Sequence, residues 1–251
     1  MATVVLTDAQ ILAGGYDVSG VTNQVALEYG AEALDDTHFG DTTRIAKGGL
    51  KTVELSLSGH MEYGDTSIDK ILFDNLGGPA SAEPIADPLS LIAEGGQFGE
   101  VGYFFRPLLT SFPPVSGEVG ELVPYEAQLV SRTGAPLIRS EVMHDTDTAR
   151  TATGNGSGSQ IGALATAQDS MYLALHVIAA SVADTLDITV ESDDNSGFTS
   201  ATTRITAVQA TAVSAQYLSV AGPITDDWWR IVFTIGGTAP SFTFAALLGI
   251  A

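Results

Sequence analysis

The stretch GLKTVELSLSGH, residues 49–60, decides the fold, because its side chains alternate between apolar and polar along the chain. The apolar members are Val53, Leu55 and Leu57, and the residues between them are Glu54 and Ser56. A period of two is typical of a β-strand that buries one face and exposes the other to solvent. The stretch therefore predicts a half-buried strand with a polar outer face.

Two further stretches show the same alternation: NQVALEYG, residues 23–30, and VPYEAQLVS, residues 123–131. Their polar members are acidic or neutral, never basic. The candidates for one shared polar face are Gln24, Glu28, Glu54, Ser56, Glu126 and Gln128. The segment that follows, residues 132–142, places Arg132-Thr133-Gly134 where a hairpin turn between two strands is expected.

One short helix is predicted between the strands, in DTSIDKILFDNLGG, residues 65–78. Residues 65–67 supply N-cap side chains, and Gly77 can end the helix. Its expected apolar face consists of Ile68, Ile71, Leu72 and Leu76. The proline-containing residues 77–88 predict a loop, and Pro107 restricts the strand predicted over residues 102–112 to a sheet edge or a bulge.

The composition changes at residues 145–160, DTDTARTATGNGSGSQ, which are small, polar and rich in glycine. Short β-rich runs separated by turns follow, a spacing typical of a β-sandwich or jelly roll. We therefore expect a mainly β protein with a first domain at residues 1–150, a Gly/Ser-rich linker or loop at residues 151–165, and a β-sandwich domain at residues 166–251.

Charge excludes one large class of function. The chain has 10 basic and 30 acidic residues, a formal net charge of −20, and the excess is spread over both predicted domains. Binding to nucleic acid requires Lys and Arg to neutralise phosphates, which this composition does not supply. There is no cysteine, so disulfides, thiolate metal sites and cysteine nucleophiles are excluded. We expect no cleaved leader and no membrane insertion, because no apolar run is long enough.

The segment between the first two strands carries the densest group of polar side chains. Asp35, Asp36, His38 and Asp41 include the residue types that bind a hard cation or zinc, but their spacing matches neither an HExxH motif nor an EF-hand loop. A solvated loop is the favoured interpretation. No nucleophile elbow or phosphate-binding loop is present either, so we expect no enzyme and no cofactor.

Trp228 and Trp229 are candidate exposed aromatic residues for a carbohydrate-binding face. Adjacent residues on a strand point to opposite sides of the sheet, so we expect one ring in the core and the other partly exposed.

The order of these pieces resembles the major tail tube proteins of long-tailed bacteriophages. The strand NQVALEYGAEAL leads into DDTHFGDTTR, then the returning strand GLKTVELSLSGHMEYG, the helix SIDKILFDNL and the segment GELVPYEAQLVSRTGAPLIRSEV. The resemblance covers residues 1–150, and Thr37 to Asp41 followed by Gly-Leu before a strand is its most telling part. The second domain loosely resembles the immunoglobulin-like or jelly-roll modules appended to phage structural proteins.

The resemblance implies hexameric rings whose inner strands join into one β-barrel, and rings that stack into a tube in the virion tail, assembled in the host cytoplasm. The six polar-face candidates would then line a channel through which DNA passes without specific binding. The implied partners are other copies of the chain and the terminator, tape measure and baseplate or tip proteins. A loop reaching the neighbouring subunit or ring would contain Asp35, Asp36, Thr37, His38, Phe39, Asp41 and Arg44.

Two alternatives stay open at this point. One is another ring of the tail, a terminator or head–tail joining protein, which would form a single ring without stacking. The other is a decoration or adhesion protein that binds host-surface glycans through the second domain.

Overall fold

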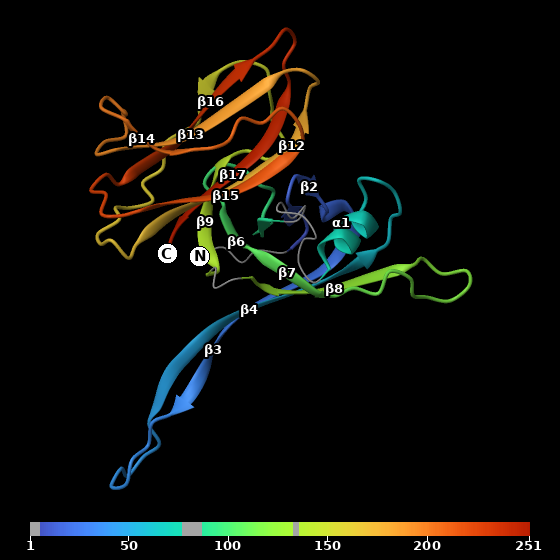
Figure 1. The fold of residues 1–251 in the computed structure, drawn as a ribbon, viewed down its shortest axis with the longest axis vertical. Helices are drawn as coiled ribbons and strands as arrows, with labels where there is room; N and C mark the ends of the chain where they lie inside the picture. The colour runs from blue at the N-terminus through green and yellow to red at the C-terminus, as the bar shows by residue number, and fades with distance from the viewer. Residues whose placement is uncertain (1–5, 77–86, 133–135) are drawn as a thin grey trace.

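The computed structural model describes residues 6–76, 87–132 and 136–251, and the fold is mainly β. Three antiparallel sheets of four, nine and four strands make up the body, and a long two-stranded arm projects from it (Figure 1). The one α-helix in the described part of the chain, α1 (Ile68–Asn75), is not long enough to cross a membrane.

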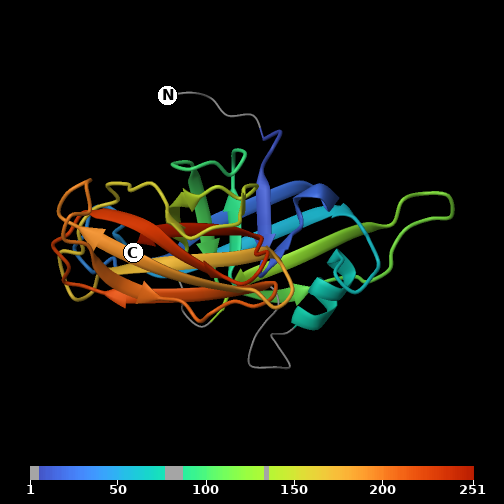
Figure 2. The same ribbon diagram turned by 90° about the horizontal axis from the view of Figure 1, so that it is seen from above.

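The first four-stranded sheet has the order β3-β4-β8-β7. Its members are β3 (Thr22–Asp35), β4 (Ala46–His60), β8 (Pro124–Ser131) and β7 (Pro107–Ser111). We call it the arm sheet, because β3 and β4 extend far beyond its other two strands and form the projecting arm. The connection between β7 and β8 projects from one side of the body (Figures 1 and 2).

One face of the arm sheet is apolar and buried. Val53, Leu55 and Leu57 of β4 pack there beside Tyr125 and Leu129 of β8, as the period-two pattern predicts. The helix α1 covers this face with Ile68, Ile71 and Leu72. Leu76 departs from the predicted helix face: it lies just beyond the helix, bridges to Leu109 of β7 and keeps 48% of its surface exposed.

The nine-stranded sheet joins both halves of the chain in the order β15-β12-β17-β9-β6-β5-β1-β2, with β10 also paired to β17. Its first-half strands are β1 (Gln10–Ala13), β2 (Tyr16–Asp17), β5 (Leu89–Ile92), β6 (Val101–Phe105), β9 (Ile138–His144) and β10 (Ala149–Arg150). The second-half strands are β12 (Ser170–Ala180), β15 (Ser214–Ala221) and β17 (Phe242–Ile250). The two regions that the sequence divides into domains thus share one sheet through the β9–β17 pair.

The structure tests two predictions about how strands are connected, one at Pro107 and one at residues 132–134. The single strand predicted over residues 102–112 is wrong, because the chain passes from β6, inside the nine-stranded sheet, to β7, in the arm sheet. β7 begins at Pro107 and is an edge strand, as expected for a strand that contains proline. The hairpin predicted at Arg132-Thr133-Gly134 is wrong, because β8 pairs with β4 and β7 whereas β9 pairs with β6 and β17. Residues 133–135 themselves, like most of the predicted loop at 77–88, lie outside the described residues.

The third sheet has the order β11-β16-β13-β14 and packs on β12 and β17 to form a sandwich core. Its members are β11 (Gly154–Asn155), β16 (Trp228–Gly236), β13 (Thr185–Asp193) and β14 (Thr202–Thr206). The strands β12 and β17 are buried on both faces. Leu173 and Phe244 face the sandwich core, whereas Ala174 and Ala245 face the interior of the curled nine-stranded sheet.

The segment predicted as a linker is ordered against the third sheet. Gly154 and Asn155 pair with β16, and the backbone N–H of Ser159 donates to the carbonyl of Trp229 at 2.9 Å. Leu164 exchanges two backbone hydrogen bonds of 2.9 Å with Ile224. Of the two predicted alternatives, linker or loop, residues 151–165 form a loop packed on the third sheet: small residues let this backbone lie close to β16, and Gly158 sits under the ring of Phe198.

A buried histidine joins the two ends of the curled sheet. His176 of β12 accepts a hydrogen bond from Ser90 Oγ of β5 at 2.7 Å and donates its Nδ1–H to the carbonyl of Gly14 after β1. The imidazole is fully buried, and this burial lowers the pKa of His176 from 6.5 to about 4.

We expect this histidine to make the fold sensitive to moderate acid. The unfolded chain binds a proton at His176 near pH 6.5, whereas the folded chain does so only near pH 4, so stability falls as pH drops through this window. The shift corresponds to about 3 kcal/mol of unfolding free energy lost by pH 4. Urea unfolding at pH 7, 6, 5 and 4 measures it. A His176→Gln variant should show a flatter dependence, and an equally steep one would contradict the assignment.

Candidate functional surface

The outer face of the arm sheet gathers all six polar-face candidates. Cross-strand register places Gln24 opposite Ser58, Glu28 opposite Glu54, and Ser56 opposite Gln128. Partners in an antiparallel ladder point to the same side. The six side chains Gln24, Glu28, Glu54, Ser56, Glu126 and Gln128 therefore share the face opposite the buried Val53, Leu55 and Leu57.

This face is polar, acidic and open to solvent. Ser56 Oγ donates to Gln128 Oε1 at 2.7 Å across the β4–β8 pair, over a shallow hollow of about 240 Å³. Glu28 and Glu54 stand directly opposite each other, and Glu126 adds a third carboxylate on β8. No Lys or Arg lies in residues 22–30, 52–60 or 124–131, so the surface presents uncompensated negative charge.

The segment between β3 and β4 forms the end of the arm. Arg44 pairs with Asp35 at 3.1 Å, and Lys47 pairs with Asp36 at 2.7 Å, across the two sides of the hairpin. Hydrogen bonds from Thr37 and Arg44 hold the pKa of Asp35 below its ordinary value. Two further hydrogen bonds, from the Thr37 backbone N–H to Asp35 and from the Ile45 backbone N–H to Thr37 Oγ1, also join residues within this segment.

The acidic residues of the arm make polar contacts within it. Asp41 Oδ2 accepts a hydrogen bond from the backbone N–H of His38 at 2.7 Å, and the His38 ring lies 3.9 Å from the same carboxylate. Within the described ranges, no group of three or more His, Cys, Asp or Glu side chains is arranged to hold an ion. The carboxylates of Asp35, Asp36 and Asp41 thus accept hydrogen bonds from turn residues or pair with cations.

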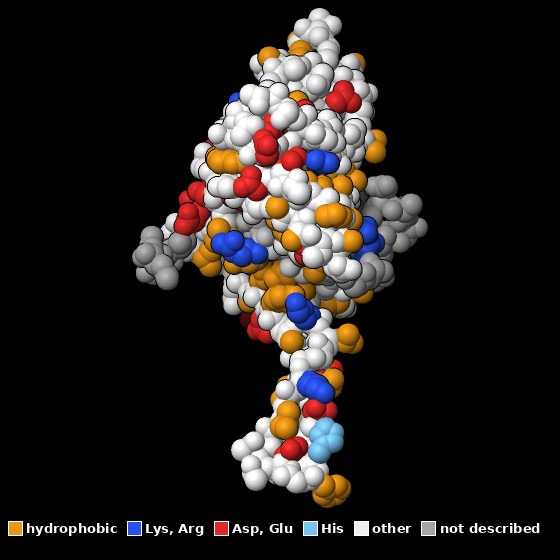
Figure 3. Space-filling view, turned by 90° about the vertical axis from the view of Figure 1, so that its left-hand side faces the viewer, with side chains coloured by type: hydrophobic (Ala, Val, Ile, Leu, Met, Phe, Trp, Pro, Cys, Tyr) orange, Lys and Arg blue, Asp and Glu red, His pale blue; other side chains and the backbone are white. Residues whose placement is uncertain are grey.

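The arm exposes several apolar side chains. Phe39 at its tip is fully exposed, Leu50 is 80% exposed, and Leu34 and Ile45 are also exposed. Figure 3 shows the arm as a narrow projection on which hydrophobic, acidic and basic side chains alternate. Exposed apolar groups on a projection separate from the core are typical of contact surfaces.

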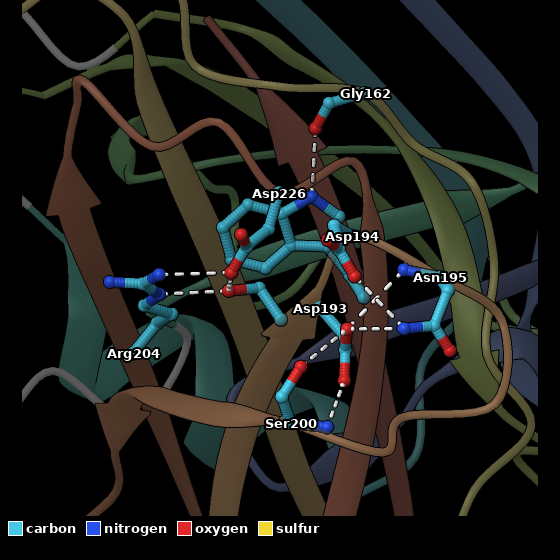
Figure 4. Close-up of polar contacts among 9 residues, drawn as sticks. Gly162, Asp193, Asp194, Asn195, Ser200, Arg204 and Asp226 are labelled. Carbon is cyan, nitrogen blue, oxygen red and sulfur yellow. Dashed lines mark hydrogen bonds and ion pairs between the residues drawn. The ribbon is translucent and has the colours of Figure 1, made fainter.

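The DDNSG segment, residues 193–197, is a structural turn rather than a cation loop. Asp193 Oδ2 accepts a hydrogen bond from the backbone N–H of Ser200 at 2.8 Å, and its Oδ1 accepts one from Asn195 Nδ2 at 2.8 Å (Figure 4). Both carboxylate oxygens are thus used in holding the loop after β13.

A second carboxylate lies beside this turn. Asp226 accepts hydrogen bonds from Ser192 Oγ at 2.6 Å and Arg204 Nη2 at 2.9 Å, and these bonds lower its pKa below the ordinary value. Ser192 lies on β13, Arg204 on β14 and Asp226 in the segment before β16, and Figure 4 shows the side chains of Arg204 and Asp226 pointing toward each other. The network ties the edge strand β14 to the sheet.

The two tryptophans have different environments. Trp229 is fully buried in the sandwich core and donates its Nε1–H to the carbonyl of Gly162 at 2.8 Å. Trp228 is half-buried on the other side of β16. The expected division between one core and one partly exposed ring is confirmed, and Trp229 is wrong as an exposed aromatic candidate because its strand position faces the core.

We expect Trp229→Ala to lower the unfolding free energy by about 3–5 kcal/mol, because it leaves a cavity and orphans the Gly162 carbonyl. Trp228→Ala serves as the matched control and should cost about 1 kcal/mol, since its ring is only half-buried. Urea unfolding followed by far-ultraviolet circular dichroism measures both. Equal losses in the two variants would contradict the assigned core position of Trp229.

Sequence reasoning missed one surface. The connection between β7 and β8 exposes Val115, Val119 and Leu122 at 75%, 107% and 72%, together with the carboxylates of Glu118 and Glu121. The sequence PPVSGEVGEL could have indicated this exposed loop, because it is rich in glycine and proline. Its isolated apolar residues follow neither the helix nor the strand period, so no regular element would bury them.

Comparison with known proteins gives similarities of low degree. No protein-family model and no curated protein matches the chain. Among solved structures, the chain is similar to one from the virion of a native gene transfer agent particle, with 19% identity and a TM-score of 0.41 over 54% of this chain and 98% of that chain. It is also similar to the tube-terminating cap of the anti-feeding prophage, with 10% identity and a TM-score of 0.40 over 55% and 93% of the two chains.

The SPP1 Dit protein, described as a hub adsorption-apparatus protein of phages that infect Gram-positive bacteria, matches over 97% of this chain and 99% of its own. Its identity is 9% and its TM-score 0.35. These identities and TM-scores are too low to assign a function.

Proposed function

We propose that this chain is a structural subunit of a bacteriophage tail tube, in which six copies form a ring and rings stack into a channel for DNA. It acts in the virion tail and not as an enzyme. One observation carries the proposal: a sheet with β3 and β7 as its edge strands in the described chain, a buried apolar face and an acidic outer face, extended by a projecting arm.

The free edges supply the means of ring closure. In the described chain, β3 pairs only with β4 within the arm sheet, and β7 pairs only with β8 as a strand. Unpaired edges of this kind present a row of backbone donors and acceptors to another chain. Pairing β3 of one copy beside β7 of the next would satisfy both edges, and a closed barrel would leave none free.

The dimensions suit a DNA conduit. Six copies of a four-stranded sheet supply 24 strands. At a spacing of about 4.8 Å, these strands close a circle of about 115 Å, or about 37 Å across the backbone, and strand tilt widens it. Such a barrel leaves room for a DNA duplex inside its wall.

The polar face suits the inside of that barrel. α1 covers the apolar face, so the face left for the channel is the one with Glu28, Glu54 and Glu126. A wall of carboxylates repels phosphate and lets DNA slide without binding. Lumen-facing roles for Gln24, Ser56 and Gln128 follow from the same face.

The projecting arm favours stacked rings over a single ring. Its exposed Phe39 and Leu50 would gain cover only from a further chain. Tail terminator, tape measure and baseplate proteins are the remaining partners in this proposal. A glycan-binding role for the second half has less support, since Trp229 is unavailable to a ligand.

Negative-stain imaging of concentrated protein, with mass photometry of a dilute sample, tests the proposal. Hollow tubes with a regular axial repeat are the expected result. Closed rings that never stack would indicate a terminator or joining ring instead. Protein that stays monomeric at high concentration, and is not recruited by native tails, would overturn the tube assignment.

A further inference from the structure

The arm and the β7–β8 connection lie at opposite ends of the same sheet. β4 runs from Ala46 in the arm to His60, and His60 pairs with Pro124 at the start of β8. Residues 112–123, which we call the β7–β8 loop, therefore lie at the end of the sheet away from the arm, as Figures 1 and 2 show.

A groove lies at the base of the arm. β8 pairs with β4 only as far as Glu54, so beyond that point one edge of β4 is unpaired within the described chain. The groove beside it has a volume of about 520 Å³, and its lining includes the apolar Leu50, Val53, Val130 and Pro136 and the charged Lys51 and Glu54.

We propose that this groove receives the β7–β8 loop of a second copy of the chain, in the next ring of the stack. The inference deepens the proposed tail tube function and rests on it. In this contact, Val115, Val119 and Leu122 of the loop would pack on the apolar lining of the groove. Glu118 and Glu121 of the loop would pair with Lys51.

The chemistry of the two surfaces is complementary. Lys51 lies over the ring of Tyr29, 5.7 Å from its centroid, and makes no ion pair with a carboxylate of the described residues. Glu118 and Glu121 likewise make no ion pair within the described ranges, and the loop contains no Lys or Arg. Lys51, which lies beside apolar groups in the groove, can therefore pair with Glu118 and Glu121, which lie beside apolar groups on the loop.

The position of the two surfaces sets the kind of assembly. A contact between two different patches is heterologous, and between successive rings such a contact repeats along the stack without closing. Each added ring would present a fresh set of grooves or loops at its free end. The contact would therefore extend a tube rather than cap it.

The absence of cysteine allows a direct test. Leu50→Cys protein is mixed with Val119→Cys protein, concentrated and treated with a short bismaleimide. We expect cross-linked dimers that join position 50 of one chain to position 119 of another, identified by peptide mass spectrometry. Val208→Cys, at a site 74% exposed in the second half of the chain, replaces Val119→Cys in the control mixture and should give at least about tenfold less product.

The outcomes separate this contact from the tube itself. Tubes without the 50–119 product would overturn the contact and leave the tube proposal standing. The product without tubes would support the contact and overturn stacking of hexameric rings. Neither tubes nor product would overturn both.

Charge exchange gives a second measurement. Lys51→Glu should raise the protein concentration needed for tube growth by about tenfold, because the repulsive contact recurs six times in each ring. The E118K/E121K double variant should also raise the protein concentration needed for tube growth. A chain that carries these two changes together with Lys51→Glu should grow tubes at the wild-type concentration. Failure of the combination to restore growth, with all variants folded, would count against the ion pairs.

Discussion

Replacing residues 32–50 with Asn-Gly is expected to abolish tube formation while leaving the body of the protein folded. Ala31 and Lys51 are paired across β3 and β4, so a two-residue turn can join them directly. Within the removed segment only Asp36 and Gly49 are half-buried, and every other residue is exposed. Removal of the arm therefore costs little packing but eliminates the surface that we assign to the neighbouring ring.

The folding control is a thermal unfolding curve. The ion pairs lost, Asp35 with Arg44 and Asp36 with Lys47, are exposed and internal to the arm, so the melting temperature should change by only a few degrees. Mass photometry and negative-stain imaging then show whether single rings persist without stacking. Tubes of normal length from the shortened chain would contradict a stacking role for the arm.

A point variant narrows the same question. Phe39 is fully exposed, so Phe39→Ser removes no contact within the chain and should leave unfolding unchanged. If the Phe39 side chain is covered by another subunit in the assembly, the Phe39→Ser variant should lengthen the lag before tube growth. A matched change at the exposed Val182, in the second half of the chain, should have no effect.

The second large expected effect is retention of DNA by a charge-reversed channel. The triple variant E28K/E54K/E126K changes the chain from −20 to −14 and places every new cation on one face of the arm sheet. Tubes assembled from it in the presence of a short duplex should bind the DNA and protect it from nuclease. Affinity should fall steeply with added salt, since phosphate neutralisation releases counterions.

The matched control carries the same charge change elsewhere. Asp65, Glu94 and Asp147 are exposed and lie outside the arm sheet, so the triple Lys variant of these residues also reaches −14. Its tubes should leave any bound DNA open to nuclease, as should wild-type tubes. Equal protection by both triple variants would show that the polar face of the arm sheet does not line the channel.

The local sequence was sufficient to predict which faces of the half-buried strands and helix are buried. The alternation of residues 49–60 predicted which side chains of β4 are buried, and the same pattern placed the six polar candidates on one face. The short helix was predicted with one error, at Leu76, which lies past the last turn. In each case the signal is a periodicity that the backbone geometry of one element imposes on its own residues.

The sequence did not predict which strands pair with each other. Residues 132–142 looked like the second half of a hairpin, yet β9 crosses to the other sheet, because register and partner are decided by apolar surfaces far apart in the chain. The glycine-rich residues 151–165 looked flexible for the same reason. Their order comes from backbone hydrogen bonds to β16, which composition does not reveal.

The sequence by itself determined a mainly β chain with an acidic composition, no cysteine and one polar face on each of the three strands that alternate, because composition and period act residue by residue. Only the tertiary structure decided that the two halves share a nine-stranded sheet, that Trp229 is buried while Trp228 is not fully so, and that the arm and the β7–β8 loop lie at opposite ends of one sheet. These depend on long-range packing, in which each strand is stabilised by partners that its own sequence does not specify.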